Sequence, residues 1–410
     1  MSSEFSNIKE LYEKFLQFPF VCTDTRKIIP NSLFFCLKGD NFDGNLFAEE
    51  ALEKGARYVI TGDNALKTLQ QLANYHRSQL KIPIIGITGT NGKTTTKELI
   101  ASVLSKKYKT AYTQGNLNNH IGVPLTLLSI KKEDEIAVIE MGANHAKEIE
   151  ELCQIAQPDY GLITNIGKAH LEGFGSIECI IETKTALYRA AQVLFVNAED
   201  EVLRQKAESR RQKEIQFYGK NTNVTGHIIE MNPYLIIDLF GKKIQTYLTG
   251  NYNLPNILGA AAIGRFFGVP NQDICDAIAE YFPQNHRSQI IKSNTNTIIA
   301  DYYNANPTSM KVALDNLLQL EAPHKLAILG DMLELGESSL PEHQIIVDFC
   351  KEKKLEAIFI GSVFYTLKNK HFLFFMNVED CNNYLKNKKL KNNFVLLKGS
   401  RGMYFENIIL

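Results

Sequence analysis

The fold of this chain is decided by residues 82–108, IPIIGITGTNGKTTTKELIASVLSKKY, where an apolar strand runs into a glycine-rich segment and then into an amphipathic helix. A loop in that context directs backbone N–H groups towards an anion, and the helix N-terminus adds positive potential. Lys93 is placed to reach terminal phosphates, and the Thr94 hydroxyl is placed to hold Mg²⁺. Ile87 stands where the strict pattern G-x-x-x-x-G-K-[ST] has glycine, so the stretch predicts a variant phosphate loop.

Short apolar runs alternate with amphipathic helical stretches on both sides of this loop, which is typical of α/β folds. We expect three units, at residues 1–80, 81–285 and 286–410. In the middle unit, residues 214–249 suggest an antiparallel edge and a helix is expected over 256–268. Strands are expected at 33–37, 58–61, 82–87, 136–141, 160–166, 193–197, 297–303, 325–331, 357–361 and 394–399.

Composition excludes several classes of function. Lys+Arg and Asp+Glu both total 45, and a net charge of zero argues against a nucleic-acid partner. No apolar run approaches the roughly 18 residues of a membrane span. Residues 1–18 predict an amphipathic helix rather than a secretory signal. The seven cysteines are scattered without metal-ligand spacing, so we expect reduced thiols in a cytoplasm.

Further motifs accompany the loop over most of the chain. They are GNLNNHIGVPLTLL (115–128), EMGANHAKEI (140–149), NIGKAHLEGFGS (165–176), DYYNANPTSM (301–310), LGDMLELGE (329–337) and KGSRGM (398–403). Together with GTNGKTTT (89–96), they resemble the Mur ligases, the enzymes that build the peptide of the bacterial cell wall. The segment TDTRKIIPNSLFFCLKGDNFDGN (23–45) resembles the uridine-binding domain of that family. The resemblance implies an N-terminal α/β domain that binds the UDP-sugar, a central phosphate-loop ATPase domain with a parallel sheet, and a C-terminal Rossmann-like domain.

The implied activity is that of an ATP-dependent acid–amino-acid ligase. Within the family, the motifs favour the addition of D-alanyl-D-alanine to UDP-N-acetylmuramoyl-tripeptide, a step of peptidoglycan precursor synthesis. ATP would phosphorylate the tripeptide carboxylate, and the dipeptide amine would attack the acyl phosphate. Two anions must meet first, so metal ions and lysines are needed to neutralise them. The resemblance implies these two substrates as partners, in the bacterial cytoplasm. We also expect no nucleic-acid partner, no membrane span and a monomer.

The resemblance also assigns metal ligands and catalytic groups. Glu140, which ends an apolar strand, and Thr94 would bind one Mg²⁺, and His170 would lie at a second. Lys184 aligns with a lysine that the family carbamylates, although Ala186 replaces an expected glutamate nearby. Glu172 is a candidate neighbour of His170. The residues given catalytic roles are Lys93, Lys184, His170 and Arg287.

ATP-binding residues are expected in three segments. The loop contributes Gly89, Thr90, Asn91, Gly92, Lys93, Thr94 and Thr95. Asn253 and Asn256 match an adenine-contacting turn, because amides donate and accept at once, and Asn256 is also expected to cap the following helix. Tyr252 replaces the usual histidine there. Arg287, at the second junction, would contact the phosphates, and Asp301 and Asn304 would lie against the ribose and adenine.

Contacts with the other substrates are implied at both ends of the chain. Thr23, Asp24, Thr25 and Arg26 match the uridine-diphosphate segment, with hydroxyls in place of the usual serines, and Asp43-Gly44-Asn45 follows it. The muramoyl-peptide path would be lined by Asn116, Asn118 and Asn119. Residues expected near the incoming dipeptide are Tyr303, Asn306, Lys398, Ser400 and Arg401.

Three alternatives remain open at this point. A relative such as folylpolyglutamate synthase shares the loop, but lacks the segments 23–45 and 301–310. The tripeptide-forming Mur ligase carries a DNPR-type motif that this chain does not contain. A non-catalytic nucleotide switch is compatible with Ala186 and Tyr252, but not with the joint presence of Lys93, Glu140 and the other expected ligands.

Overall fold

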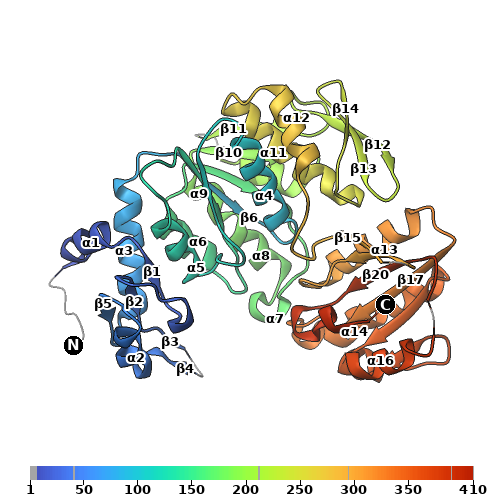
Figure 1. The fold of residues 1–410 in the computed structure, drawn as a ribbon. Coiled ribbons are helices and arrows are strands. Elements are labelled where there is room, and N and C mark those ends of the chain that lie inside the picture. The colour runs from blue at the N-terminus through green and yellow to red at the C-terminus, as the bar shows by residue number, and fades with distance from the viewer. Residues whose placement is uncertain (1–6, 40–41, 211–212, 294, 389, 410) are drawn as a thin grey trace.

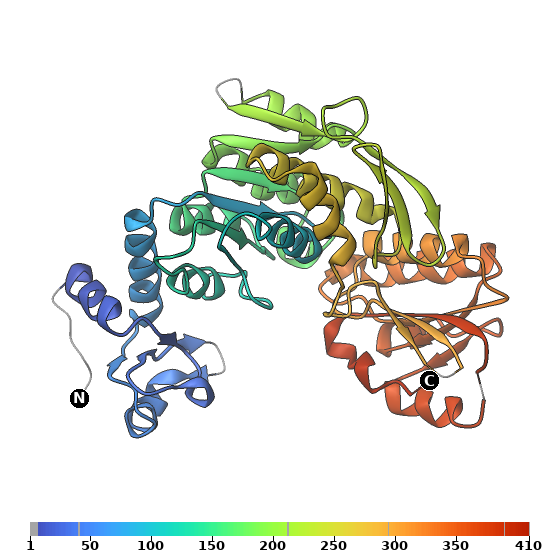
Figure 2. The same cartoon turned by 45° about the horizontal axis from the view of Figure 1, so that its top comes forward.

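The structure, a computed structural model, describes residues 7–39, 42–210, 213–293, 295–388 and 390–409. Its elements form three regions, and the N-terminal and C-terminal regions lie on opposite sides of the middle one in both views (Figures 1 and 2). Parallel sheets covered by helices confirm the predicted α/β class. Within the described residues, no helix combines the length and apolar character that crossing a membrane requires.

The N-terminal region is built on a small parallel sheet in the order β1-β2-β5. Its elements are α1 (Ile8–Gln17), β1 (Val21–Cys22), β2 (Leu33–Phe35), β3 (Lys38–Gly39), β4 (Phe42–Asp43), α2 (Ala48–Glu53), β5 (Tyr58–Ile60) and α3 (Ala65–Gln79). Helix α3 extends beyond this sheet and packs on helices of the middle region (Figure 1). The expected N-terminal helix begins at Ile8, and the first six residues of its predicted range lie outside the described part of the chain.

The middle region is built on a six-stranded parallel sheet in the order β11-β10-β9-β6-β8-β7. Its strands and helices are β6 (Ile84–Thr88), α4 (Lys93–Leu104), β7 (Thr110–Tyr112), α5 (Gly122–Leu128), β8 (Ile136–Glu140), α6 (Glu148–Ala156), β9 (Tyr160–Ile163), α7 (Leu171–Phe174), α8 (Ile177–Lys184), α9 (Ala186–Ala190), β10 (Val193–Asn197), α10 (Glu201–Glu208) and β11 (Glu214–Tyr218). Ile87 on β6 pairs with Glu140 on β8, and Thr88 pairs with Ile163 on β9. The carboxyl ends of these three strands therefore meet at one edge, where the phosphate loop begins.

Beyond β11 the chain forms a separate antiparallel sheet, β12 (Gly226–Met231), β13 (Leu235–Leu239) and β14 (Lys242–Gln245), followed by α11 (Leu254–Phe266) and α12 (Asn271–Glu280). The prediction of one antiparallel edge over 214–249 was therefore wrong for its first strand. β11 pairs in parallel with β10, because the crossover through α10 brings it back in the same direction. Only the three later strands are antiparallel.

The C-terminal region has a six-stranded sheet in the order β15-β16-β20-β17-β18-β19, parallel except for β15. Its elements are β15 (Gln289–Lys292), β16 (Thr297–Ala300), α13 (Pro307–Gln319), β17 (His324–Gly330), α14 (Ser339–Glu352), β18 (Glu356–Ile360), α15 (Ser362–Thr366), β19 (Leu373–Phe375), α16 (Val378–Leu385) and β20 (Asn393–Lys398). The expected strand 297–303 is wrong at its end, since β16 stops at Ala300 and 301–303 form the loop above the sheet. Because β16 and β20 are neighbours, Asp301 and Lys398 emerge side by side.

Arg77 fastens α3 to the middle region. Its buried guanidinium donates to the carbonyls of Ala156 (3.0 Å) and Gln157 (2.9 Å), and it pairs with the Asp159 carboxylate at 2.9 Å. The same carboxylate accepts from the N–H of Ile84, at the start of β6. One cation therefore ties the last turn of α3 to two strands of the central sheet.

We expect Arg77→Ala to lower the free energy of unfolding by about 2 kcal/mol, because buried carbonyls and a carboxylate lose their charged donor. Urea unfolding followed by circular dichroism measures the change. The matched control is Arg204→Ala, which removes an exposed pair with Glu208 at 3.5 Å and should cost less than about 0.5 kcal/mol. Equal effects of the two variants would contradict this role for Arg77.

His343 shapes the loop that follows β17. Its ring is fully buried, Nε2 accepts from the N–H of Met332 at 2.9 Å, and Nδ1 donates to the Ser339 carbonyl at 2.6 Å. Burial lowers the pKa of this imidazole, while nearby Asp331 and Glu342 oppose that shift. The neutral ring is thus the folded form, and the motif LGDMLELGE is partly structural.

This arrangement predicts a pH dependence of stability. The unfolded chain protonates His343 near its ordinary pKa of about 6.5, whereas the folded chain does so only at lower pH. The unfolded state then binds more protons below about pH 6.5, so the free energy of unfolding falls as the pH decreases from there. Urea unfolding between pH 5 and 7.5 should show a shallower decline in His343→Gln than in the wild type, and identical slopes would refute the assignment.

Candidate active site

Two glycines give the phosphate loop its shape. Gly89 and Gly92 have φ values of +146° and +80°, in the region that disfavours other residues. A Cβ atom on Gly89 would lie 1.9 Å from the Thr164 hydroxyl, and one on Gly92 would lie 2.8 Å from the Asn256 amide oxygen. Close packing of β9 and α11 against the loop therefore requires glycine at both positions.

Lys93 folds back over this loop. Its Nζ donates to the carbonyls of Gly89 at 2.8 Å and Thr90 at 3.1 Å. Burial lowers the pKa of Lys93 to about 8, which Glu140 opposes and Arg287 reinforces. A nearby phosphate would supply the negative charge that this ammonium lacks.

Glu140 offers an open position for a cation. Its side chain is 1% exposed, and Oε1 accepts from the Thr94 hydroxyl at 3.2 Å and the Asn118 amide at 2.8 Å. Oε2 is buried and has no hydrogen-bond partner in the part of the chain that the structure describes. An orphaned carboxylate oxygen beside a hydroxyl fits Mg²⁺, which prefers oxygen ligands and uses few protein groups. The expected pair Thr94 and Glu140 is thus brought together by the structure.

Thr164 and Asn165, which the sequence analysis missed, support the loop. Thr164 Oγ1 donates to the Asn91 carbonyl at 2.6 Å, and the Asn165 side chain both accepts from the Asn91 N–H (3.0 Å) and donates to its carbonyl (2.9 Å). Their position at the carboxyl end of β9 was the available signal, because that edge of a parallel sheet collects ligand-binding groups.

Lys184 and His170 lie near the loop in different surroundings. Lys184 ends α8, is 3% exposed, and its Nζ faces the Phe174 ring at 5.7 Å. Burial and the neighbouring Lys93 hold its pKa well below the ordinary value. His170 lines the cavity, and its Nδ1 lies against the Glu334 carboxylate of the C-terminal region. Glu172, expected beside His170, packs against Gly336 in the same contact.

The asparagines of the expected adenine turn form an amide pair. Asn253 donates to the Thr249 carbonyl at 2.8 Å, and Asn256 donates to the Asn253 side chain at 3.0 Å. The expectation that Asn256 caps a helix was wrong, because α11 already begins at Leu254 and Asn256 lies inside its first turn. Asn256 instead packs its amide against Gly92, so the pair orients a side chain towards the phosphate loop.

Two guanidiniums approach one aromatic ring at the second junction. Arg287 stacks on Tyr303 at 3.9 Å from the ring centroid, and Arg401 lies 5.4 Å from the same centroid. The Arg287 Nε is buried and donates no hydrogen bond to any residue that the structure describes. Both arginines line the cavity, and among the described residues neither stands in an ion pair with a carboxylate. They are therefore available to anionic ligands.

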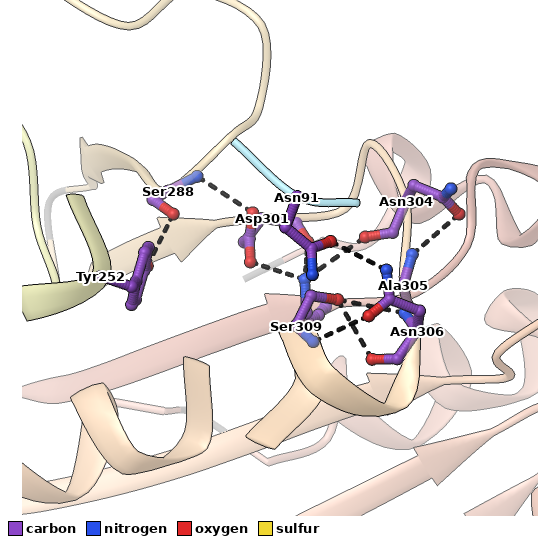
Figure 3. A network of polar contacts seen from close by, with 9 residues as sticks. Asn91, Tyr252, Ser288, Asp301, Asn304, Ala305, Asn306 and Ser309 are labelled. Carbon is purple, nitrogen blue, oxygen red and sulfur yellow. Dashed lines mark hydrogen bonds and ion pairs between the residues drawn. The ribbon is translucent and has the colours of Figure 1, made fainter. Parts of the chain in front are cut away.

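Asp301 and Lys398 neutralise each other between two strand ends. The Lys398 Nζ lies 2.7 Å from the Asp301 carboxylate and 3.3 Å from the Asn304 carbonyl. The other carboxylate oxygen accepts from the Ser288 N–H at 3.1 Å, and the Ser288 hydroxyl meets the Tyr252 hydroxyl at 2.7 Å (Figure 3). Tyr252, the departure from the usual histidine, thus connects the middle region to the C-terminal one.

One cavity of about 1080 Å³ joins these groups. Of the expected residues it is lined by Thr90, Asn91, Gly92, Lys93, Thr95, Asn116, Asn118, Asn119, Glu140, His170, Asn253, Asn256, Arg287, Asp301, Tyr303, Asn304, Asn306, Lys398, Ser400 and Arg401. The expected residues that do not line it are Thr23, Asp24, Thr25, Arg26, Gly89, Thr94 and Lys184. Polar residues that line it and that the sequence analysis missed include Gln70, His120, Asn144, His145, Glu148, Glu151, Gln154, Ser288 and Glu334.

The expected uridine segment lies on the N-terminal region, away from that cavity wall. Asp24 accepts from the Arg26 guanidinium at 2.7 Å, and this hydrogen bonding holds the Asp24 pKa at about 2. Asp43 binds the N–H and amide of Asn45, whose own oxygen accepts from Gly62 at 2.8 Å. These local pairs order two adjacent loops.

Comparison with known proteins agrees with the motifs along the whole chain. Models of the Mur ligase family catalytic domain, the Mur ligase middle domain and the Mur ligase glutamate ligase domain match residues 17–101, 87–264 and 286–401. A Bacillus subtilis protein named UDP-N-acetylmuramoyl-tripeptide–D-alanyl-D-alanine ligase is 35% identical over 95% of this chain and 92% of its own length.

Solved structures give the same grouping. A crystal structure of MurF from Acinetobacter baumannii has a TM-score of 0.87 at 31% identity, over 94% of this chain and 91% of that one. MurF ligase from Thermotoga maritima in complex with ADP has a TM-score of 0.83 at 27% identity, over 95% of this chain and 96% of that one. With its phosphate loop, three matching domains and full-length relatives, this chain belongs to the Mur ligase family.

Proposed function

We propose that this chain joins D-alanyl-D-alanine to UDP-N-acetylmuramoyl-tripeptide at the cost of ATP, as its relatives' names indicate for those proteins. The observation that carries the proposal is one cavity in which the phosphate loop, the open Glu140 oxygen and two unpaired arginines converge. Such a set suits a reaction in which two anions must be held together.

The first step is phosphorylation of the tripeptide carboxylate by ATP. Lys93 exchanges the loop carbonyls for phosphate oxygens, and Arg287 neutralises charge on the transferred group. Thr94 and Glu140 would hold a Mg²⁺ ion, which supplies charge neutralisation between the nucleotide and the carboxylate when it is bound. Asn253 and Asn256 lie behind the loop, where the adenine is expected.

Lys184 is proposed to act as a carbamate. Its depressed pKa favours the neutral amine, which can add to CO₂ with release of one proton. The resulting anion relieves the repulsion between Lys184 and Lys93, and together with His170 it would form the second metal position. Ala186, two residues after Lys184, is buried, and it offers no carboxylate in place of the glutamate that the family resemblance leads us to expect there.

The second step is attack of the dipeptide amine on the acyl phosphate, followed by loss of phosphate. The residues proposed to face the dipeptide are Tyr303, Lys398, Ser400 and Arg401, with Asp301 and Asn304 nearer the nucleotide. Asn116, Asn118 and Asn119 would line the muramoyl-peptide path. Thr23, Asp24, Thr25 and Arg26 would bind the uridine diphosphate end.

The proposal also assigns a role to each domain, an oligomeric state and a cellular location. Residues 1–80 would act as the uridine-binding unit, 81–285 as the ATP-binding unit and 286–410 as the ligase unit of a monomer. The enzyme would serve peptidoglycan precursor synthesis in a bacterial cytoplasm. The relatives' names and the segment DYYNANPTSM favour this activity over the tripeptide-forming and folate-type alternatives.

Phosphate release should depend on the dipeptide. With ATP, Mg²⁺ and UDP-N-acetylmuramoyl-tripeptide, we expect release only when D-alanyl-D-alanine is added, and a UDP-muramoyl-pentapeptide mass in the products. Lys93→Ala should abolish both signals. Phosphate release at the same rate without the dipeptide would refute the proposed substrate pair. Turnover with diaminopimelate, lysine or glutamate in place of the dipeptide would refute it as well.

Glu140→Gln should weaken the dependence of nucleotide affinity on Mg²⁺. Glutamine retains an oxygen for Thr94 and Asn118, but it removes the charge that attracts the cation. Titration of a fluorescent ATP analogue should show a Mg²⁺-dependent gain in affinity that is at least tenfold smaller in the variant. Glu151→Gln, an exposed position of the cavity wall, is the matched control and should behave as wild type. An unchanged magnesium effect in Glu140→Gln would contradict the site.

A further inference from the structure

A side chain of the C-terminal region forms a hydrogen bond with the phosphate loop. Asn306 donates from its amide nitrogen to the Asn91 side-chain oxygen at 2.8 Å, across 215 positions of sequence (Figure 3). Asn91 belongs to the loop, and its backbone is already fixed by Thr164 and Asn165. Its side chain is therefore a firm anchor on the middle region for whatever approaches it.

The orientation of the Asn306 amide is fixed by its helix. Asn306 caps α13, its oxygen accepts from the Ser309 N–H at 2.8 Å, and its own N–H donates to the Ser309 hydroxyl at 3.1 Å. Because the cap requires the oxygen on the helix side, the nitrogen must point outward, where it meets Asn91. The side chain is 7% exposed, so this donor has few other partners.

A second contact docks the same helical turn. The Thr308 hydroxyl accepts from the Lys168 N–H at 3.2 Å, and the Lys168 ammonium pairs with Glu342 at 2.8 Å. Gly167 faces Thr308 so closely that a Cβ there would lie 3.0 Å from its hydroxyl. The first turn of α13 is thus seated on two loops of the middle region, and Asn306 makes the contact with the loop that is expected to bind ATP.

We propose that Asn306 is a positioning residue that sets the C-terminal region on the phosphate loop through Asn91, rather than a group that contacts the dipeptide. The contact fixes the distance between Lys93 and the strand ends that carry Asp301 and Lys398. This inference rests on the proposed function, since the alignment matters for passing an acyl phosphate made on one region to an amine held on the other.

The test is a double-mutant cycle built on Asn306→Ser and Asn91→Ala. Serine caps a helix as well as asparagine, but it is too short to reach Asn91. We expect Asn306→Ser to lower kcat/KM for the dipeptide about tenfold, with the melting temperature unchanged. In the Asn91→Ala background the same change should alter kcat/KM by less than about twofold, because the contact is already lost.

Each contrary outcome overturns the inference. An equal loss in both backgrounds would mean that Asn306 binds substrate directly, and no loss in either would mean that it only caps α13. A lowered melting temperature would assign the effect to the cap. The matched control is Asn7→Ser at the cap of α1, which accepts from the N–H groups of Lys9 and Glu10 and should leave kcat/KM unchanged.

Small-angle scattering supplies a readout that needs no turnover. With ATP analogue and Mg²⁺ bound, we expect a larger radius of gyration for Asn306→Ser than for the wild type and for Asn7→Ser. Identical radii would overturn the positioning role. A wild-type protein without dipeptide-dependent turnover would instead refute the proposed function while leaving this measurement valid.

Discussion

Buried lysines, and arginines that stand in no ion pair among the described residues, gather around one cavity, and they are the constraint on which the rest of the structure depends. Lys93 has a pKa lowered to about 8, and Lys184 is buried beside it with its own pKa depressed. Arg287 and Arg401 gather at Tyr303. Lys398, by contrast, forms an ion pair with Asp301. Cations held in this way raise the free energy of the unliganded protein, and phosphate and carboxylate groups relieve it on binding.

The N-terminal and C-terminal regions are joined to the middle region by contacts of different kinds. Arg77 and the packing of α3 fasten the N-terminal region to the middle one through buried contacts. The contacts of the C-terminal region with the middle one include polar pairs, among them Asn306 with Asn91 and Tyr252 with Ser288. Polar interfaces within a chain favour relative motion of domains. The C-terminal region is therefore the unit whose position ligands can most readily change.

Sequence reasoning succeeded where the signal was local. The strand, glycine loop and helix over 82–108 predicted the phosphate loop, and Glu140 was placed correctly at the end of an apolar strand. Sequence reasoning failed where contacts with other elements determine the local structure. β11 looked like part of an antiparallel edge because strand direction depends on the crossover, and Asn256 looked like a cap because α11 starts earlier than its sequence suggests.

Contacts between side chains that are far apart in the sequence could not be predicted from local sequence patterns. Asp301 and Lys398 were each expected to face a ligand, yet they are 97 positions apart and neutralise each other. Asn306 was expected at the dipeptide, while its fixed amide points to the loop. Glu140 keeps one oxygen without a partner because the Thr94 hydroxyl and the Asn118 amide both bind its other oxygen. The positions of these two side chains are set by the packing of the strands.

Oxygen transfer tests the central claim, that the cavity activates a carboxylate by phosphorylation, most directly. UDP-N-acetylmuramoyl-tripeptide labelled with ¹⁸O in its reacting carboxylate would be turned over with ATP and D-alanyl-D-alanine, and the released phosphate weighed. An acyl phosphate predicts one ¹⁸O atom in each phosphate formed with product, since the bond between the acyl carbon and the bridging oxygen breaks when the amine attacks. Unlabelled phosphate, or label appearing in AMP, would contradict the account.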